Sequence, residues 1–160
     1  MFELVPIGSV TAARREAVDD FWGGEIATIT LADGVPSDAL VGLDAFSHVE
    51  IIYVFDRVTP DNIVTGARHP RNNPAWPKVG IFAQRGKNRP NRLGIAVGRI
   101  VRVGERTLEV AELDAIDGTP VVDIKPVMRE FVPRGEIVQP AWATELMVDY
   151  WLSSRPGRSS

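Results

Sequence analysis

The chain of 160 residues contains no cysteine, which excludes disulfide bonds and thiolate metal sites. Histidine is almost as scarce, and only His48 and His69 are available as imidazole ligands. A metal site would need carboxylates for its other ligands, and a packed, internally hydrogen-bonded His48 is the simpler interpretation. We therefore predict no metal. The cytoplasm is the natural compartment for a chain without cysteine, although an oxidising compartment stays open.

Long apolar runs and common site motifs are also missing. No stretch approaches the roughly 18 uninterrupted apolar residues of a membrane-spanning helix, and residues 1–6 lack the cationic part of an export signal. The sequence has no G-x-G-x-x-G after a strand, no G-x-x-x-x-G-K-[ST], no H-E-x-x-H and no G-x-S-x-G. These absences predict a soluble protein that is not a conventional Rossmann, P-loop, zinc-protease or hydrolase enzyme.

Acidic residues are absent from one long segment, residues 62–104, which holds nine of the 18 lysines and arginines. The rest of the chain carries the other nine cations and all 21 acidic residues, a net charge of -12. This separation favours a basic face for phosphates or another anionic surface, because steering depends on the local field. Arg99 and Arg102 have a simpler interpretation, as solvated residues at a strand edge.

Short runs rich in Val, Ile and Thr, bounded by Gly, Pro, Asn and Asp, are typical of β-strands. Seven such runs without long helices between them predict an all-β fold, a single-domain barrel. Within the longest run, the residues after Gly98 alternate, which predicts a bend or bulge near this glycine. The predicted strands are residues 2–7, 25–31, 48–55, 79–83, 93–103, 107–113 and 121–124.

Two peripheral helices are expected beside the barrel. The first spans residues 37–46, where Ser37 is a capping residue and apolar residues recur at a spacing of three. The second is a C-terminal helix over residues 140–153, because Pro140 suits a first helical position. Its aromatic stripe is better explained by packing in the core or in a dimer than by stacking on bases.

Two stretches lack the pattern of a strand or helix. Residues 59–78 contain four prolines, so they predict a long surface loop, and long loops in compact domains tend to be functional. Residues 154–160 are polar and predict a disordered tail. The expected organisation is therefore one domain over residues 1–153 followed by this tail.

The densest group of cations lies in residues 85–94, which carry Arg85, Lys87, Arg89 and Arg92. Proline, asparagine and glycine residues between them stiffen the turn, so the charges are presented from a defined backbone. Forked guanidinium groups on such a loop bind carboxylate or phosphate in a bidentate manner.

A carboxylate-rich turn follows further along the chain. Asp114, Asp117 and Asp123 surround the Gly118-Thr119-Pro120 segment and offer carboxylates to ribose hydroxyls or to a cationic ligand group. The simpler alternative is that residues 117–118 form a hairpin turn and Asp123 pairs with Lys125 in a salt bridge. Residue chemistry alone leaves both interpretations open.

Three segments together resemble the signature of the TsaA-like family, whose best-known members are the TrmO-type tRNA methyltransferases. The segments are residues 80–85 (GIFAQR), 89–94 (RPNRLG) and 113–126 (LDAIDGTPVVDIKP). Residues 7–8 and 42–48 also match, so that the resemblance covers most of residues 2–126. It implies a β-barrel unrelated to Rossmann methyltransferases, a homodimer that binds S-adenosylmethionine and methylates N6-threonylcarbamoyladenosine beside the anticodon of tRNA.

The resemblance also implies roles for individual residues. The cofactor-binding residues would be Asp56, Arg57, Arg85, Ile95, Leu113 and Asp114. The RNA-binding residues would be Lys87, Arg89 and Arg92. For the transfer itself we hypothesise in-line displacement driven by positioning, with Asp117 as a candidate proton acceptor and Lys125 as an electrostatic helper. Trp22 is a candidate for stacking on adenine, but a buried tryptophan is the simpler interpretation.

Two other functions stay open at this stage. A methyltransferase of a small molecule or another substrate would keep the cofactor pocket without needing the whole basic face. A noncatalytic module would bind S-adenosylmethionine without turning it over. Binding and single-turnover measurements separate these alternatives.

Overall fold

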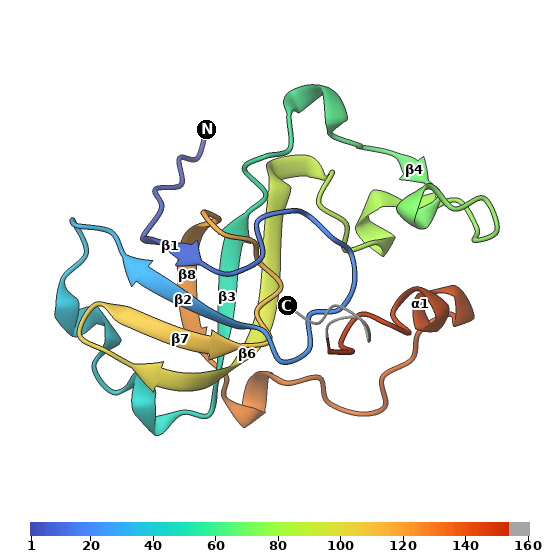
Figure 1. The fold of residues 1–160 in the computed structure, drawn as a ribbon. Helices are drawn as coiled ribbons and strands as arrows, with labels where there is room; N and C mark the ends of the chain where they lie inside the picture. Colours follow the sequence, from blue (N-terminus) through green and yellow to red (C-terminus); the bar gives the residue numbers. More distant parts are fainter. Residues whose placement is uncertain (154–160) are drawn as a thin grey trace.

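The computed structural model describes residues 1–153, and its centre is a closed, antiparallel barrel of six strands (Figure 1). The strands are hydrogen-bonded in the order β1-β2-β7-β6-β3-β8. Their bounds are β1 Gly8–Thr11, β2 Ile26–Leu31, β3 His48–Val54, β6 Leu93–Val103, β7 Thr107–Ala111 and β8 Pro120–Pro126. Closure pairs both edges of every strand, and it confirms the predicted all-β barrel.

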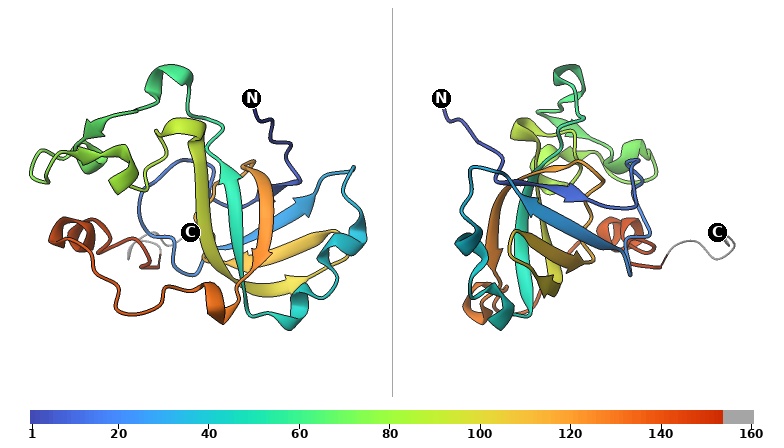
Figure 2. Two further views of the ribbon diagram at one scale, coloured as in Figure 1. Left: turned by 180° about the vertical axis from the view of Figure 1, so that it is seen from behind. Right: turned by 60° about the vertical axis from the view of Figure 1, so that its left-hand side comes forward.

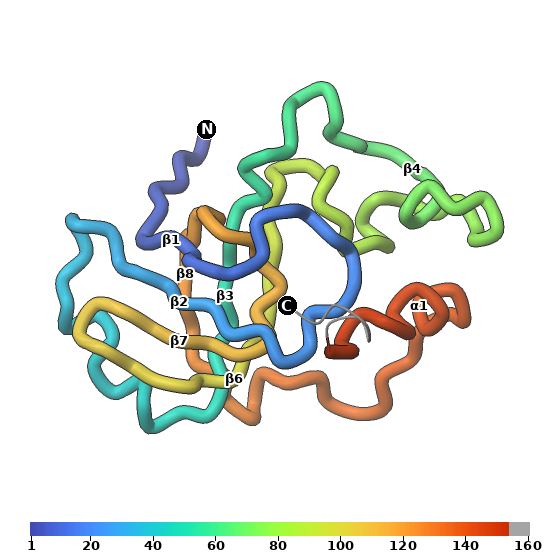
Figure 3. The backbone as a smooth tube through the Cα atoms, viewed as in Figure 1, coloured from blue at the N-terminus to red at the C-terminus, as the bar shows by residue number. Residues whose placement is uncertain are grey.

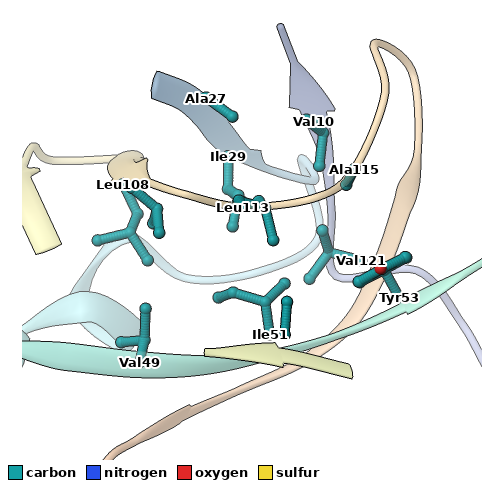
Figure 4. Packing of buried hydrophobic residues seen from close by; sticks show 12 residues of the cluster. Val10, Ala27, Ile29, Val49, Ile51, Tyr53, Leu108, Leu113, Ala115 and Val121 are labelled. Carbon is teal, nitrogen blue, oxygen red and sulfur yellow. The ribbon is translucent and has the colours of Figure 1, made fainter. Parts of the chain in front are cut away.

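Alternate residues of each strand fill the barrel interior. In β3, Val49, Ile51 and Tyr53 are buried while the residues between them are more exposed. They pack against Leu108 and Val110 of β7 and the other members of one apolar cluster (Figure 4). Each fully buried aliphatic side chain contributes about 1.5–3 kcal/mol, so this cluster holds the barrel together.

Gly98 lies where the interior has no room for a side chain. A Cβ atom at this position would stand 2.2 Å from Val110 Cγ1 and 3.0 Å from the carbonyl oxygen of Ala111. The register between β6 and β7 shifts further along, between Ile100 and Arg102. The predicted bulge is therefore present, but between Ile100 and Arg102 and not at Gly98. Glycine is needed at residue 98 because a side chain there would overlap Val110 and Ala111.

One end of the barrel carries most of the irregular chain. Strands β1, β3 and β7 end there and β2, β6 and β8 begin there, so residues 12–25, 55–92 and 112–119 share one rim, called the site rim below. The loops at the opposite rim are residues 32–47 and 104–106.

Residues 55–92 form an insert that extends beside the barrel (Figure 1). Its regular pieces are short, and the only ladder in it joins β4 to β5. The pieces are η3 Pro60–Asn62, β4 Ala67–Arg68, η4 Pro70–Asn72, β5 Val79–Gly80, η5 Ile81–Ala83 and η6 Pro90–Arg92. Prolines begin three of the four 3-10 turns. The predicted surface loop, residues 59–78, therefore consists of short 3-10 turns and one short strand joined by irregular backbone.

Several predicted elements are shorter than expected or differ in type. The first strand begins at Gly8, not at residue 2, and the predicted strand of residues 79–83 divides into β5 and η5. Residues 37–46 form two 3-10 turns, η1 Ser37–Leu40 and η2 Leu43–Ala45. They do not form one helix, because Gly42 between them has a φ of 88°.

The C-terminal segment, residues 127–153, runs from the opposite rim back to the site rim (Figures 1 and 2). It contains η7 Arg129–Phe131 and α1 Ala141–Leu146, so the predicted helix of residues 140–153 is only one and a half turns long. The predicted tail, residues 154–160, lies outside the described residues.

After α1 the chain turns and lies along residues 21–23 (Figure 3). The backbone N–H groups of Phe21, Trp22 and Gly23 donate to the carbonyls of Asp149, Tyr150 and Leu152 at 3.1, 2.8 and 3.1 Å. A Cβ on Gly23 would stand 2.1 Å from the Trp151 carbonyl oxygen, so this close approach needs glycine.

No helix within residues 1–153 has both the length and the apolar character needed to cross a membrane.

Candidate active site

Asp114 lies between two tyrosine side chains at the site rim. The Tyr53 hydroxyl, at the end of β3, donates to Asp114 Oδ1 at 3.0 Å and also lies 3.3 Å from the Asp114 carbonyl oxygen. The Tyr150 hydroxyl, from the C-terminal segment, donates to Asp114 Oδ2. Three separate parts of the chain thus meet at one half-buried carboxylate.

The two phenols act only as donors. Burial, followed by the charge and hydrogen bond of Asp114, raises the pKa of Tyr53 far above its usual value. The same causes raise the pKa of Tyr150, and the positive charge of Arg85 lowers both in part. An ionised carboxylate accepts about four hydrogen bonds, so two tyrosines leave Asp114 with acceptor capacity for a ligand.

Arg85 stands beside this cluster. Its charge acts on both tyrosines, and its Nη2 donates to the carbonyl oxygen of Ile95 at 2.9 Å. The Ile95 side chain is on the outer face of β6 and exposed, whereas Leu113 is buried in the barrel core. Of the six predicted cofactor residues, Arg85 and Asp114 therefore lie together at this rim, and Ile95 contributes only its carbonyl oxygen to Arg85. The side chain of Leu113 faces the core, away from any ligand at the surface.

The other two, Asp56 and Arg57, directly follow Phe55 at the end of β3. Asp56 is exposed, and Arg57 donates to the carbonyl oxygens of Arg15 at 2.5 Å and Asp117 at 3.2 Å. Arg57 therefore joins two rim loops through main-chain contacts, and its remaining N–H groups are at the surface.

Asp117 has a structural position in the turn after Asp114. Its Oδ1 accepts the backbone N–H of Ala12 at 3.0 Å, and its own N–H donates to the Arg14 carbonyl at 2.7 Å. Gly118, the next residue, has a φ of 84°. Residues 117–118 therefore form a turn, but not the expected hairpin, because β7 and β8 on its two sides are not paired with each other. Asp117 holds the first rim loop to this turn.

Lys125 is not part of the Asp114 cluster. Its Nζ pairs with Asp123 Oδ2 at 2.8 Å, and this contact raises the pKa of Lys125. The residue lies opposite Glu50 on the outer face of the barrel, whereas Tyr53 points inward. The salt-bridge interpretation of Asp123 is thus confirmed, and the predicted electrostatic role of Lys125 lacks the necessary geometry.

The basic loop uses two of its cations to hold its own shape. Arg89 Nη1 donates to the Gln84 carbonyl and Arg92 Nη1 to the Val58 carbonyl, both at 2.7 Å. These bonds support a backbone with φ values of 61° at Asn91 and 52° at Arg92. Lys87 is exposed, so Arg85 and Lys87 are the residues of this loop that present the most charge to solvent.

Sequence reasoning missed the contacts that tie the rim loops together. Arg71 in the insert makes a bidentate contact with Asp20, at 2.9 and 3.1 Å, and Trp76 Nε1 donates to Glu145 Oε2 at 2.8 Å. The sequence did hold one signal for the Arg71 contact: two adjacent aspartates at residues 19–20, and a cationic segment at residues 62–104 that has no acidic residue of its own to pair with. The partnership of Tyr53 and Tyr150 had no local signal at all.

Trp22 is buried, with the Arg14 guanidinium 3.9 Å above its ring. The buried interpretation of this tryptophan is confirmed, and its covered face is not available to stack on adenine.

Within residues 1–153, no group of three or more His, Asp or Glu side chains is arranged to hold a metal ion.

A closed antiparallel barrel with a carboxylate and an arginine at its looped rim defines a β-barrel domain that is not of the Rossmann type. The model of the tRNA-methyltransferase O N-terminal domain matches residues 20–131. The chain therefore belongs to this family.

Individual relatives agree with the family match. The tRNA (adenine(37)-N6)-methyltransferase of Mus musculus is 38% identical over 96 residues, which are 60% of this chain and 22% of that protein. The Escherichia coli protein of the same name is 35% identical over 122 residues, covering 71% of this chain and 52% of its own length. The chain thus spans between about a fifth and a half of these curated relatives.

A solved structure shares the fold. The crystal structure of TrmO from Pseudomonas aeruginosa superposes with a TM-score of 0.66 at 26% identity. The match covers 85% of this chain and 61% of that one. The barrel and most of the segments around it therefore recur in that protein.

Proposed function

We propose that this chain is an S-adenosylmethionine-dependent methyltransferase that modifies the N6 position of adenine 37 in tRNA. N6-threonylcarbamoyladenosine is the proposed form of the acceptor. The observation that carries this function is Asp114, held by two tyrosines beside Arg85 at the rim of a barrel of this family.

The donors and acceptors at the site rim fit the cofactor. Asp114 has free acceptor positions for the ribose hydroxyls or the ammonium group, and Arg85 has N–H groups beyond the one on Ile95 for the carboxylate. The bound cofactor supplies an electrophilic methyl group on its sulfonium. Tyr53 and Tyr150 fix the orientation of the carboxylate, and Tyr150 covers one side of it.

Positioning of the acceptor nitrogen is the proposed source of the rate. Lys125 pairs with Asp123 on the outer face, so the proposed mechanism gives it no role in the transfer. Asp117 accepts one backbone N–H at Oδ1 and keeps acceptor capacity at Oδ2, so it stays the proposed acceptor of the departing proton, directly or through water.

A homodimer is proposed through the outer face of β6. Ile95, Val97 and Val101 are exposed on this strand, and Ile52 of β3 lies opposite Ile95. Adjacent apolar side chains on one sheet face are typical of an interface. Sedimentation of the wild type and of Val97→Asp tests this dimer, and a monomeric wild type would reject it.

The proposed compartment is the cytoplasm, where tRNA is available.

A single-turnover assay tests the proposed activity. The full chain is mixed with radiolabelled methyl donor and bulk tRNA from cells that lack the modification, and label in adenine 37 is the expected result. Tight donor binding without label in RNA would reject a tRNA enzyme. Label in RNA that persists after Asp114→Ala would reject the proposed cofactor site.

A further inference from the structure

Arg68 in β4 carries a buried nitrogen without a partner. Its Nε is inaccessible and makes no hydrogen bond to any of residues 1–153. No carboxylate of the described chain forms a salt bridge with its guanidinium. The side chain as a whole is half-buried, and none of its nitrogens donates to another group within residues 1–153. A charged group left without partners is costly, so the terminal nitrogens of this guanidinium are available to an anion.

The surrounding backbone holds Arg68 in place. Gln84 Nε2 donates to the carbonyl oxygens of Arg68 at 3.0 Å and Val79 at 2.9 Å, and Val79 is also the ladder partner of Arg68. A Cβ atom on Gly86 would stand 2.9 Å from Arg68 Nη2. Gly86 therefore leaves the space that the guanidinium occupies, and its two neighbours in the chain are the exposed cations Arg85 and Lys87.

Phe82 projects into solvent from the same part of the insert, with 78% of its surface exposed. The residue before it, Ile81, is buried, and its N–H donates to the Gly66 carbonyl at 2.9 Å. The Gln84 N–H closes the turn on the Ile81 carbonyl at 3.1 Å. An aromatic ring is thus presented from a fixed turn, three residues before Arg85.

Together these features match one ligand chemistry. An unpaired guanidinium among cations, in a segment free of acids, binds an anion such as phosphate. The exposed aromatic ring of Phe82, in the same part of the insert, offers a stacking face for a base, as in proteins that bind single-stranded nucleic acid. A phosphopeptide would use the arginine but has no base for the ring.

From this we infer that Arg68 binds a backbone phosphate of the RNA substrate and that Phe82 stacks on an unpaired base next to it. The inference rests on the proposed function and names a binding site for that same substrate. Arg85 links the two sites, because it lies beside the Asp114 cluster and only one residue from Gly86. The contacted nucleotide therefore lies close to the base that receives the methyl group.

Salt-dependent RNA binding by the full chain separates the two contacts. The probe is tRNA from cells lacking the modification, titrated by fluorescence anisotropy at several salt concentrations. Arg68→Gln should weaken binding and reduce the slope of log K against log salt by about 0.7–0.9, the value of one phosphate contact. Phe82→Ala should weaken binding about tenfold and leave this slope unchanged.

Matched controls exclude general effects. Phe131 is 79% exposed on η7, so Phe131→Ala removes an equally exposed ring elsewhere, and Arg134→Gln removes one exposed charge. Both controls should bind RNA as the wild type does. Gly86→Ala replaces Arg68→Gln should that variant fail to fold, because the added methyl displaces the guanidinium while every charge is kept.

The outcomes distinguish this inference from the proposed activity. Wild-type RNA affinity and slope in the Arg68 and Phe82 variants, with methyl transfer intact, would overturn the inference alone. The opposite result is a wild type that transfers no methyl group although its RNA binding depends on both residues. It would overturn the proposed activity alone. Affinity for S-adenosylmethionine, measured by calorimetry, should be the same in all of these variants.

Discussion

Tyr150 and Asp114, 36 residues apart in the chain, are joined by a hydrogen bond that connects the C-terminal segment to the loop between β7 and β8. Tyr53 holds the other carboxylate oxygen from inside the barrel. The C-terminal segment is therefore one wall of the candidate site, and it does more than cover the barrel.

Tyr150→Phe should reduce both stability and cofactor affinity. The change removes one hydrogen bond to a charged group, which is worth about 1.5–3 kcal/mol when buried and less at this partly exposed position. Urea unfolding and calorimetry with S-adenosylmethionine measure the two effects. Trp151→Phe, one residue along, is the control and should alter neither by a comparable amount.

Asp114→Asn should weaken cofactor binding by more than tenfold, because an amide supplies one acceptor oxygen in place of two and no charge. Asp123→Asn is the matched control, since within residues 1–153 Asp123 pairs only with Lys125 and its own backbone neighbour on the outer face. Equal affinities of the two variants would contradict the proposed cofactor site.

Stability should fall above pH 10 because the two tyrosines hold their protons more tightly in the folded state. Their folded pKa values are raised, so their contribution is complete below the unfolded pKa of about 10 and is lost as pH rises beyond it. The loss is at most about 1.4 kcal/mol per pH unit for each tyrosine. Urea unfolding between pH 9 and 11 measures it, and the Tyr53→Phe/Tyr150→Phe double variant should lose less.

Gly98→Ala should destabilise the barrel by about 1–3 kcal/mol, because the new methyl group overlaps Val110 and the Ala111 carbonyl. At Gly66 an added Cβ would meet no atom within 4 Å, so Gly66→Ala is the control. Thermal and urea unfolding compare the two. Equal stability would show that the interior rearranges freely around residue 98.

Arg89→Ala and Lys87→Ala should have different effects although both remove one cation from the same loop. Arg89 donates to a main-chain carbonyl, so its loss should lower stability by about 1 kcal/mol as well as RNA affinity. Lys87 is exposed, and its loss should lower the affinity for RNA and the salt dependence of binding without changing stability. An unchanged unfolding free energy for Arg89→Ala would contradict the structural role.

Strands with clear alternation were predictable because the barrel interior imposes a period of two. Residues 93–103 were predicted with the bounds that β6 has, and β2 and β3 differ by one residue at one end. The C-terminal helix was predicted too long. Its aromatic residues are placed by contacts with residues 21–23 and Asp114, which a helical pattern does not record.

The candidate site was predictable only in part. Arg85 and Asp114 were predicted from residue chemistry and from the resemblance, and they do lie at one rim, but the sequence contains nothing local that pairs Tyr53 with Tyr150. Arg89 and Arg92 were expected to face RNA. Each also donates one N–H group to a main-chain carbonyl, because a loop with two left-handed residues leaves those acceptors in reach, and the expected RNA contact stays a prediction.

The C-terminal segment leaves the barrel at one end and returns a tyrosine to the other, with its last contacts made to a loop and not to a strand. A chain built this way separates folding from selectivity. Replacing residues 127–153 by another sequence would exchange the Tyr150 side of the candidate site while the pairing of the six strands keeps its own residues.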